Sequence, residues 1–396
     1  MIPTHHDVII VGGGIIGGGI AEQLRCGSRL RVSLVEQELA ACVKTSASQA
    51  AAGGINPHLY DEGDGALGPM AQRSRDLYPS WVERLSAAWG QPIELRPSGL
   101  LCMATEEKEH SRLINDVLPL LRERGVAAEE LSADEARRRE PLLGSAVTGG
   151  LWLPDDLAVE PMRVMAALEA VLKDDDGFTY VQDCAEDIRV DGDGVRVVLR
   201  SGRALRSDRV VVAAGHLSHD LVKDFIDWRD GSFRPIKGQI LEVAVPAGGG
   251  LRTQCDALVP GDGETHIVRA SPYAEGRVAV GVTHDRGDAS PGTSSRAKET
   301  ILRNLRRILP AVAGWEVIGA RAGIRPGTSD GLPIVGYVDP HRRVLAATGH
   351  NGLGITLAPR TAQLAVKLLL DMPLTEDDRD DLHVSRPERL AASRSG

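Results

Sequence analysis

Residues 7–36 constrain the fold more than any other part of the chain. The apolar and mostly β-branched run over 7–11 predicts a buried parallel strand. A glycine-rich turn over 12–17, with the sequence GGGIIG, leads into a predicted helix over 18–24. A second strand follows over 31–35. This order of strand, glycine turn, helix and strand predicts an α/β domain with a parallel sheet.

The spacing of the glycines is that of a Rossmann-like dinucleotide site. Gly12 permits the tight turn, Gly14 lets a pyrophosphate approach bare backbone, and Gly17 brings helix and strand close together. Glu36, at the end of the second strand, can accept hydrogen bonds from ribose hydroxyls and would repel a 2′-phosphate, so NADP is disfavoured. A glycine-rich turn without a ligand is the alternative, but the strand context and the acid favour a dinucleotide. The motif does not choose between NAD and FAD.

The composition is that of an ordinary folded protein with an acidic surplus. Of 396 residues 42% are hydrophobic and 26% charged, and the net charge of −9 argues against a nucleic acid partner. The five cysteines are widely spaced and never in a CxxC pair, so we expect no disulfide framework, no metal site and a cytoplasmic location. No apolar run is long enough to span a membrane. Homo-oligomer formation stays open.

The remaining patterns predict a second domain inserted into the first. Apolar spacing predicts helices over 66–90, 106–125, 161–173 and 294–309, and alternation over 231–325 predicts a second sheet. The run over 209–215 is expected to return to the first sheet. We expect a discontinuous first domain of residues 1–70, 150–230 and 326–385. A mixed-sheet α+β substrate domain would comprise residues 71–149 and 231–325, and residues 386–396 would form a flexible tail.

Six separated stretches resemble one family, the flavin-dependent D-amino acid oxidase, glycine oxidase and sarcosine oxidase superfamily. The stretches are 11–17, 50–54 (AAAGG), 212–215 (VAAG), 235–239 (PIKGQ), 323–336 (GIRPGTSDGLPIVG) and 349–359 (GHNGLGITLAP). The resemblance covers essentially the whole chain and is closest to the glycine oxidase branch. It implies FAD rather than NAD. Sarcosine oxidases attach the flavin to a cysteine in the region of Arg325, but no cysteine follows Cys255, so noncovalent FAD is expected.

The resemblance also assigns cofactor contacts to individual residues. Ser48 would contact the pyrophosphate, the backbone of Ala185 the adenine, and residues 52–54 the flavin. A helix beginning near Ile355 would stabilise negative charge on the reduced flavin through its N-terminal dipole. The full set of expected contacts is Gly12, Gly14, Ile15, Ile16, Gly17, Glu36, Gln37, Ser48, Gln49, Ala52, Gly53, Gly54, Ala185, Ala214, Gly215, Arg325, His350, Asn351, Gly352, Leu353, Gly354, Ile355 and Thr356.

Three residues are expected to act on the substrate. Arg325 matches the family arginine that forks onto the substrate carboxylate, with a structural ion pair as the alternative. His266 stands where glycine oxidases carry a pocket tyrosine, and His350 could contact flavin or substrate or be a structural histidine. Gly352 stands where glycine oxidases carry an arginine, so glycine itself is in doubt as the substrate.

The resemblance implies an enzyme that oxidises the C–N bond of a small amino acid or amine by hydride transfer to flavin N5. With O2 as the acceptor, the products would be H2O2 and an imine that hydrolyses. The sequence LGIT over residues 353–356 instead favours D-amino acid dehydrogenases, which pass electrons to another acceptor. A flavin-binding protein without turnover is a third possibility.

Overall fold

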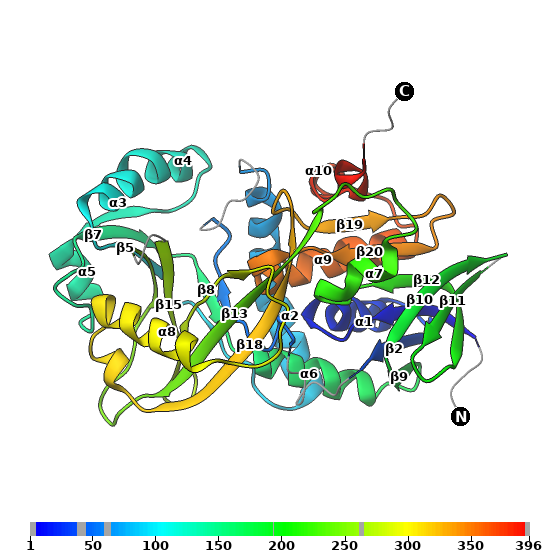
Figure 1. Ribbon diagram of the computed structural model, residues 1–396, viewed down its shortest axis with the longest axis horizontal. Coiled ribbons are helices and arrows are strands. Elements are labelled where there is room, and N and C mark those ends of the chain that lie inside the picture. Colours follow the sequence, from blue (N-terminus) through cyan, green and yellow to red (C-terminus); the bar gives the residue numbers. More distant parts are fainter. Residues whose placement is uncertain (1–4, 38–44, 59–64, 193, 261–264, 393–396) are drawn as a thin grey trace.

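A first sheet is built around the N-terminal strand β1 (His6–Val11) in the computed structural model, which describes residues 5–37, 45–58, 65–192, 194–260 and 265–392 (Figure 1). β1 pairs in parallel with β2 (Val32–Glu36) and with β12 (Ala204–Val212). The other strands of this eight-stranded sheet are β9 (Phe178–Gln182), β10 (Ala185–Asp191), β11 (Gly194–Leu199), β19 (Ile334–Tyr337) and β20 (Val344–Thr348). Every residue of β1 except Asp7 is buried, as expected for a parallel strand covered on both faces.

One face of this sheet shares an apolar core with four helices. They are α1 (Ile15–Gly27), α2 (Gly68–Trp89), α6 (Pro161–Lys173) and α9 (Gly354–Leu369). The opposite face packs against the short helix α7 (Ser218–Val222). The boundary predicted at residue 70 falls inside α2, whose Tyr78 and Trp81 are buried in the core of the first sheet. The division into domains stays a prediction.

The second sheet has nine strands and lies beside the first (Figure 1). Its longest strands, β13 (Phe233–Ala244) and β18 (Val317–Thr328), pair antiparallel along their length. The others are β5 (Leu100–Ala104), β6 (Glu129–Ser132), β7 (Gly149–Leu153), β14 (Gln254–Pro260), β15 (Thr265–Tyr273), β16 (Arg277–Gly281) and β17 (Asp285–Arg286). β14 pairs in parallel with β5, so the sheet is mixed, as predicted. Helix α8 (Ser295–Ile308) contributes Ile301, Leu305 and Ile308 to its core.

Shorter elements complete the structure. A three-stranded sheet contains β3 (Gly54–Ile55), β4 (Leu95–Arg96) and β8 (Leu157–Val159). Helix α3 (Glu107–Arg112) continues through a π-helical turn (Leu113–Val117) into α4 (Leu118–Glu123), which confirms the predicted helix over 106–125. Helix α5 (Ala133–Arg139) begins at a capping box formed by Ser132 and Glu135. Within the described ranges, no helix is both long and apolar enough to cross a membrane.

The C-terminal segment is held more firmly than its composition suggests. Helix α10 (Glu376–Val384) is tied to α9 by Arg360, whose Nε lies 2.7 Å from Asp381 Oδ2. The flexible tail predicted over 386–396 is wrong for Pro387–Leu390, which forms a 3-10 turn. Leu390 is fully buried in a core of the first sheet, and Arg389 Nε lies 2.8 Å from Asp330 Oδ2. The burial of Leu390 therefore orders this turn despite its polar composition. Residues 393–396 lie outside the described residues.

Candidate active site

A cavity of about 470 Å³ extends from the ends of the first sheet's strands to the second sheet. At one end it is lined by Glu36 and Ala185, and at the other by Arg325 of β18. The glycine turn after β1 and the start of α9 line the middle. Its volume lies within the range of about 300–1,000 Å³ usual for ligand sites. The carboxyl ends of parallel strands are the edge at which α/β folds bind their ligands.

The glycine turn has the geometry that its spacing predicts. Gly12 has a positive φ of 104°, and a Cβ on this residue would overlap the backbone of Ala213. A Cβ on Gly17 would overlap the carbonyl oxygen of Gly12, so this glycine is required for close packing of α1 on β1. Around Gly14, by contrast, an added Cβ would meet only Ser48 Oγ, 3.2 Å away. Gly14 is therefore the least crowded of these three glycines, and its backbone lines the cavity.

The N-terminus of α1 and the side chain of Glu36 meet at this turn. Glu36 Oε2 accepts a hydrogen bond from the backbone N–H of Gly13 at 2.7 Å, and its Oε1 accepts one from Gln37 at 2.8 Å. The first turn of α1 contains no acidic residue, and Ser48 Oγ accepts the N–H of Ile15 at 3.0 Å. The hydrogen bonds from Gly13 and Gln37 hold the Glu36 carboxylate at the turn, where a ribose is expected. The helix end suits an anion.

Residues 45–54 run from β18 into the cavity wall. Ser46 forms a parallel bridge with Ile324, and the N–H of Ile324 donates to Thr45 O at 3.0 Å. Gly53 has a φ of 81°, and a Cβ on it would overlap the carbonyl oxygen of Val159. A glycine at this position therefore allows the segment to pass close to the backbone of Val159.

The turn before α9 brings a second helix N-terminus to the cavity. All residues over 350–356 line it, and the first turn of α9 contains no acidic side chain. His350 is 3% exposed, and its Nε2 lies 3.0 Å from Thr361 Oγ1. Burial lowers the pKa of His350 to about 3, so the imidazole is neutral near pH 7. It anchors the turn through Thr361 while one side of the residue faces the cavity.

The Arg325 side chain lies beside two glycines, Gly238 and Gly352. It stands opposite Ile236 in the pairing of β18 with β13, and its Nη1 donates to the carbonyl oxygen of Thr283 at 3.2 Å. A Cβ on Gly238 would overlap the guanidinium group, and one on Gly352 would lie 3.9 Å from its Cδ. Gly352, which was expected to replace an arginine of glycine oxidases, therefore borders Arg325, the residue predicted to bind the substrate carboxylate.

Two further polar residues at this end were missed by the sequence analysis. Arg269 of β15 lines the cavity and is held by the buried Asp256, with 2.9 Å between Nε and Oδ1. His284 also lines the cavity, and its pKa is lowered to about 3 by loss of solvation and by the charges of nearby arginines, Arg325 first among them. Although His284 lines the cavity, it also remains exposed to solvent. Arg269 lies three residues after His266 in the same strand. An alignment shifted by three residues would therefore have identified Arg269 as the cavity residue.

Every predicted cofactor residue except Gly17 lines the cavity, while Gly17 packs inside the turn. The predicted contacts themselves stay a prediction. The backbone of His266 pairs with Val259, but its side chain lies outside the described residues, so its predicted role is not tested. Two helix N-termini whose first turns contain no acidic residue, a carboxylate at the end of β2 and a run of small residues together fit FAD.

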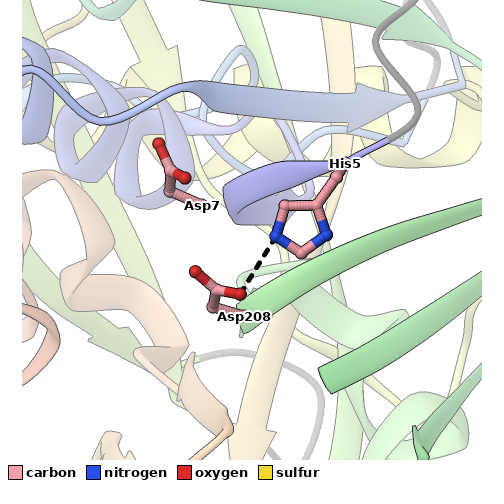
Figure 2. Close-up of side chains that lie close together, drawn as sticks. All are labelled: His5, Asp7 and Asp208. Carbon is pink, nitrogen blue, oxygen red and sulfur yellow. Dashed lines mark hydrogen bonds and ion pairs between the residues drawn. The ribbon is translucent and has the colours of Figure 1, made fainter. Parts of the chain in front are cut away.

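A separate polar cluster lies at the amino end of β1. Ligand-type atoms of His5, Asp7 and Asp208 all lie within 4.8 Å of one another, and His5 Nε2 is 3.0 Å from Asp208 Oδ1 (Figure 2). The Asp7 carboxylate, however, accepts hydrogen bonds from the backbone N–H and Nη2 of Arg31, at 2.6 and 3.1 Å. The cluster is accounted for by surface ion pairs.

The class of protein follows from comparison with known families. The model of the DAO family, described as FAD-dependent oxidoreductase, matches residues 7–368. The chain therefore belongs to this family, and it is an FAD-dependent enzyme.

Comparison with individual proteins shows which members of the family the chain resembles. The chain is 30% identical to glycine oxidase of Bacillus subtilis over 392 residues, which cover 98% of both chains. It is 30% identical over 393 residues to the bifunctional protein ThiO/ThiG of Synechocystis, where it covers only 54% of that longer protein. The crystal structure of glycine oxidase from Geobacillus kaustophilus superposes with a TM-score of 0.84 at 28% identity, covering 94% of this chain and 96% of the other.

Proposed function

We propose that this protein oxidises the C–N bond of a small amino acid or amine, with O2 as the electron acceptor. The observation that carries the proposal is the position of Arg325 in the same cavity as the N-terminus of α9. A guanidinium group can hold the carboxylate of a substrate, and the helix end favours negative charge beside it. The glycine oxidase relatives support an amino acid as the substrate class.

The proposed reaction removes one C–H bond and one N–H bond from the substrate. The amine becomes an imine, and water then converts the imine to a carbonyl compound and ammonia or another amine. When bound, FAD supplies the two-electron acceptor at its N5 position. Two electrons and two protons then pass to O2 and give H2O2.

The side chains of the cavity act by position rather than by proton transfer. Arg325 orients the substrate carboxylate, and the absence of a side chain on Gly238 lets its guanidinium group pack against the neighbouring strand. His284 and His350 are both neutral near pH 7, since the pKa of each is lowered to about 3. They can exchange hydrogen bonds with a ligand without adding charge to the site.

A flavin reduction screen tests this proposal. The purified holoprotein is mixed without air with glycine, sarcosine, and D- and L-amino acids, and the visible flavin absorbance is followed before air is admitted. Bleaching by a substrate and rapid return of colour with H2O2 is the expected result. Bleaching without rapid return would instead establish a dehydrogenase with another acceptor. Absence of bleaching by every compound would favour a flavin-binding protein without turnover.

Noncovalent binding of FAD is part of the same proposal. No cysteine follows Cys255 in the sequence, so the region around Arg325 offers no thiol for a flavin link. Acid precipitation should therefore release all of the flavin into the supernatant. Yellow colour retained in the washed precipitate would contradict this expectation.

A further inference from the structure

A proline interrupts the hydrogen-bond ladder of the helix that begins at the cavity. Pro359 lies inside α9, four residues after Ile355, and has no N–H that could donate to the Ile355 carbonyl oxygen. Ile355 is 5% exposed, so its carbonyl group lies away from bulk water. A buried carbonyl group without a partner costs free energy comparable to a lost hydrogen bond. We therefore expect a donor from outside the helix.

Two side chains of α2 supply partners on either side of this proline. The hydroxyl group of Tyr78 donates a hydrogen bond to the carbonyl oxygen of Ile355. One turn earlier on the same face of α2, Ser74 Oγ accepts the backbone N–H of Arg360 at 3.2 Å. Tyr78 is fully buried, and burial raises the pKa of Tyr78, so the hydroxyl group keeps its proton and can donate.

The peptide group that receives the Tyr78 hydrogen bond belongs to the first turn of α9. Its carbonyl end is Ile355 and its N–H end is Thr356, which lines the cavity. The Thr356 N–H is among the first four of the helix, which have no acceptor within the helix. Donation to the carbonyl end of a peptide group polarises it and makes its N–H a stronger donor. Tyr78 therefore acts on a group that faces the cofactor cavity.

We propose that Tyr78 tunes the bound flavin from outside the cavity, because its hydroxyl group strengthens the interaction of the Thr356 N–H with negative charge on the reduced cofactor. Tyr78 does not line the cavity, so it is a positioning residue that acts through one peptide group. The inference rests on the expected position of the flavin beside α9, and not on the identity of the substrate or of the electron acceptor. Its consequence for the reaction is a flavin that accepts electrons more readily.

The rival explanation is that Tyr78 only fills the core and satisfies a carbonyl group. Its ring packs edge-on against Trp81, with 5.5 Å between the ring centroids, and belongs to the same apolar core as Ile355 and Ala358. Both explanations predict a loss of stability when the hydroxyl group is removed. Only the proposed role predicts that the midpoint potential of the flavin also changes.

Two tyrosines that donate to carbonyl groups at opposite ends of the same helix provide the test. Tyr78→Phe removes the hydroxyl group near the start of α9, whereas Tyr337→Phe removes the one that donates to Leu368 O at 3.0 Å near its end. The midpoint potential of FAD in the holoprotein is measured by reductive titration against a reference dye, without substrate. We expect Tyr78→Phe to weaken the binding of reduced FAD, relative to oxidised FAD, about fivefold. This lowers the potential by about 20 mV, at about 30 mV per tenfold change for two electrons. Tyr337→Phe should leave the potential unchanged.

Restoring the backbone donor gives a second comparison. In Pro359→Ala the new N–H can donate to the Ile355 carbonyl oxygen, as in an uninterrupted helix. Tyr78→Phe should therefore lower the potential much less in combination with Pro359→Ala than alone. An equal fall in both backgrounds would mean that the Ile355 carbonyl group does not transmit the effect, and would overturn the inference.

The remaining outcomes separate the two explanations. An unchanged potential in Tyr78→Phe, together with lower thermal stability, overturns the inference and supports the purely structural role. An equal fall in Tyr337→Phe also overturns it, because a general loosening of α9 would then explain both results. If Tyr78→Phe does not fold, 3-fluorotyrosine is introduced at position 78. Its more acidic hydroxyl group donates more strongly and should raise the potential, so an unchanged potential there overturns the inference. None of these titrations uses an amine, so the flavin reduction screen tests the proposed function separately.

Discussion

The two ends of the cavity are built by different means. The glycine turn and the small residues over 45–54 form much of the cofactor end, and its geometry depends on glycines such as Gly12 and Gly17. The substrate end consists of charged and aliphatic side chains carried by strands of the second sheet. An added methyl group should therefore disrupt the cofactor end. At the substrate end, the loss of a charged group should be the more disruptive change. The difference separates tests of cofactor binding from tests of substrate binding.

The largest expected effect is at the cofactor end, from Gly17→Ala. The new Cβ would overlap the carbonyl oxygen of Gly12, which belongs to the backbone and cannot move without displacing the turn. We expect a loss of more than about 3 kcal/mol in the free energy of unfolding and a protein purified without flavin. The control is Gly27→Ala in the same helix, where a Cβ meets nothing within 4 Å. Similar flavin content in the two variants would contradict the steric role of Gly17.

The next effect is at the substrate end, from Arg325→Ala. We expect full flavin content but a loss in kcat/KM for carboxylate substrates on the order of a hundredfold or more, since truncating one partner of a shielded charge pair costs about 2–5 kcal/mol. Arg286→Ala should change kcat/KM little, because Arg286 is exposed and does not line the cavity. Unchanged kinetics in Arg325→Ala would remove this residue from the site.

A buried carboxyl behind the cavity wall should make stability depend on pH. Burial raises the pKa of Asp156 from 3.8 to about 7, partly offset by the hydrogen bond from Asn56, which lines the cavity. The folded state therefore holds a proton that the unfolded state releases, so this residue lowers stability as pH rises from about 4 to about 7.

Asp156→Asn should remove that contribution. We expect the variant to exceed the wild type in the free energy of unfolding at pH 8, by at most an amount on the order of 4 kcal/mol. The difference should be smaller at pH 5. Denaturant unfolding at both pH values measures it, and Asp155→Asn, at an exposed neighbouring position, is the control. A difference that is the same at both pH values would argue against a buried titrating carboxyl.

The smallest expected effect is from Ser48→Ala at the cofactor end. The hydroxyl group accepts the N–H of Ile15 at 3.0 Å, and a hydrogen bond of this kind contributes about 1 kcal/mol. FAD affinity should fall about fivefold, as measured by titration of the apoprotein. Ser80→Ala, on the exposed side of α2, should leave the affinity unchanged. A hundredfold loss in Ser48→Ala would mean that this side chain, rather than the backbone, dominates the cofactor end.

The same contrast explains what could be predicted from the sequence. Gly12, Gly14, Gly17 and Glu36 belong to one strand–turn–helix–strand unit, whose local spacing fixes their geometry. The return of β12 to the first sheet and a helix beginning near Ile355 were also predicted, and both are confirmed, the helix beginning at Gly354. Short-range patterns were sufficient for these features because each depends on a few neighbouring residues.

Arg269 and His284 could not be found in this way. Their place in the cavity depends on the pairing of β15 with β16, in which Arg269 stands opposite Gly281. His266, the residue expected in the pocket, lies three residues earlier in the same strand, and local alternation alone does not show which residues of a strand line a cavity. Likewise, the buried position of Leu390 depends on contact with distant strands and helices, which its polar neighbours conceal.

The bridge between Ser46 and Ile324 has a consequence for the energetics of binding. It joins the segment that borders the expected flavin position to the residue preceding Arg325. FAD that orders the bridge between Ser46 and Ile324 would also favour the position of Arg325 in which the guanidinium group binds a carboxylate. Thermodynamic reciprocity then demands that a bound carboxylate raise the affinity for FAD by the same factor. An unreactive acid in the growth or storage medium would thus slow the loss of flavin.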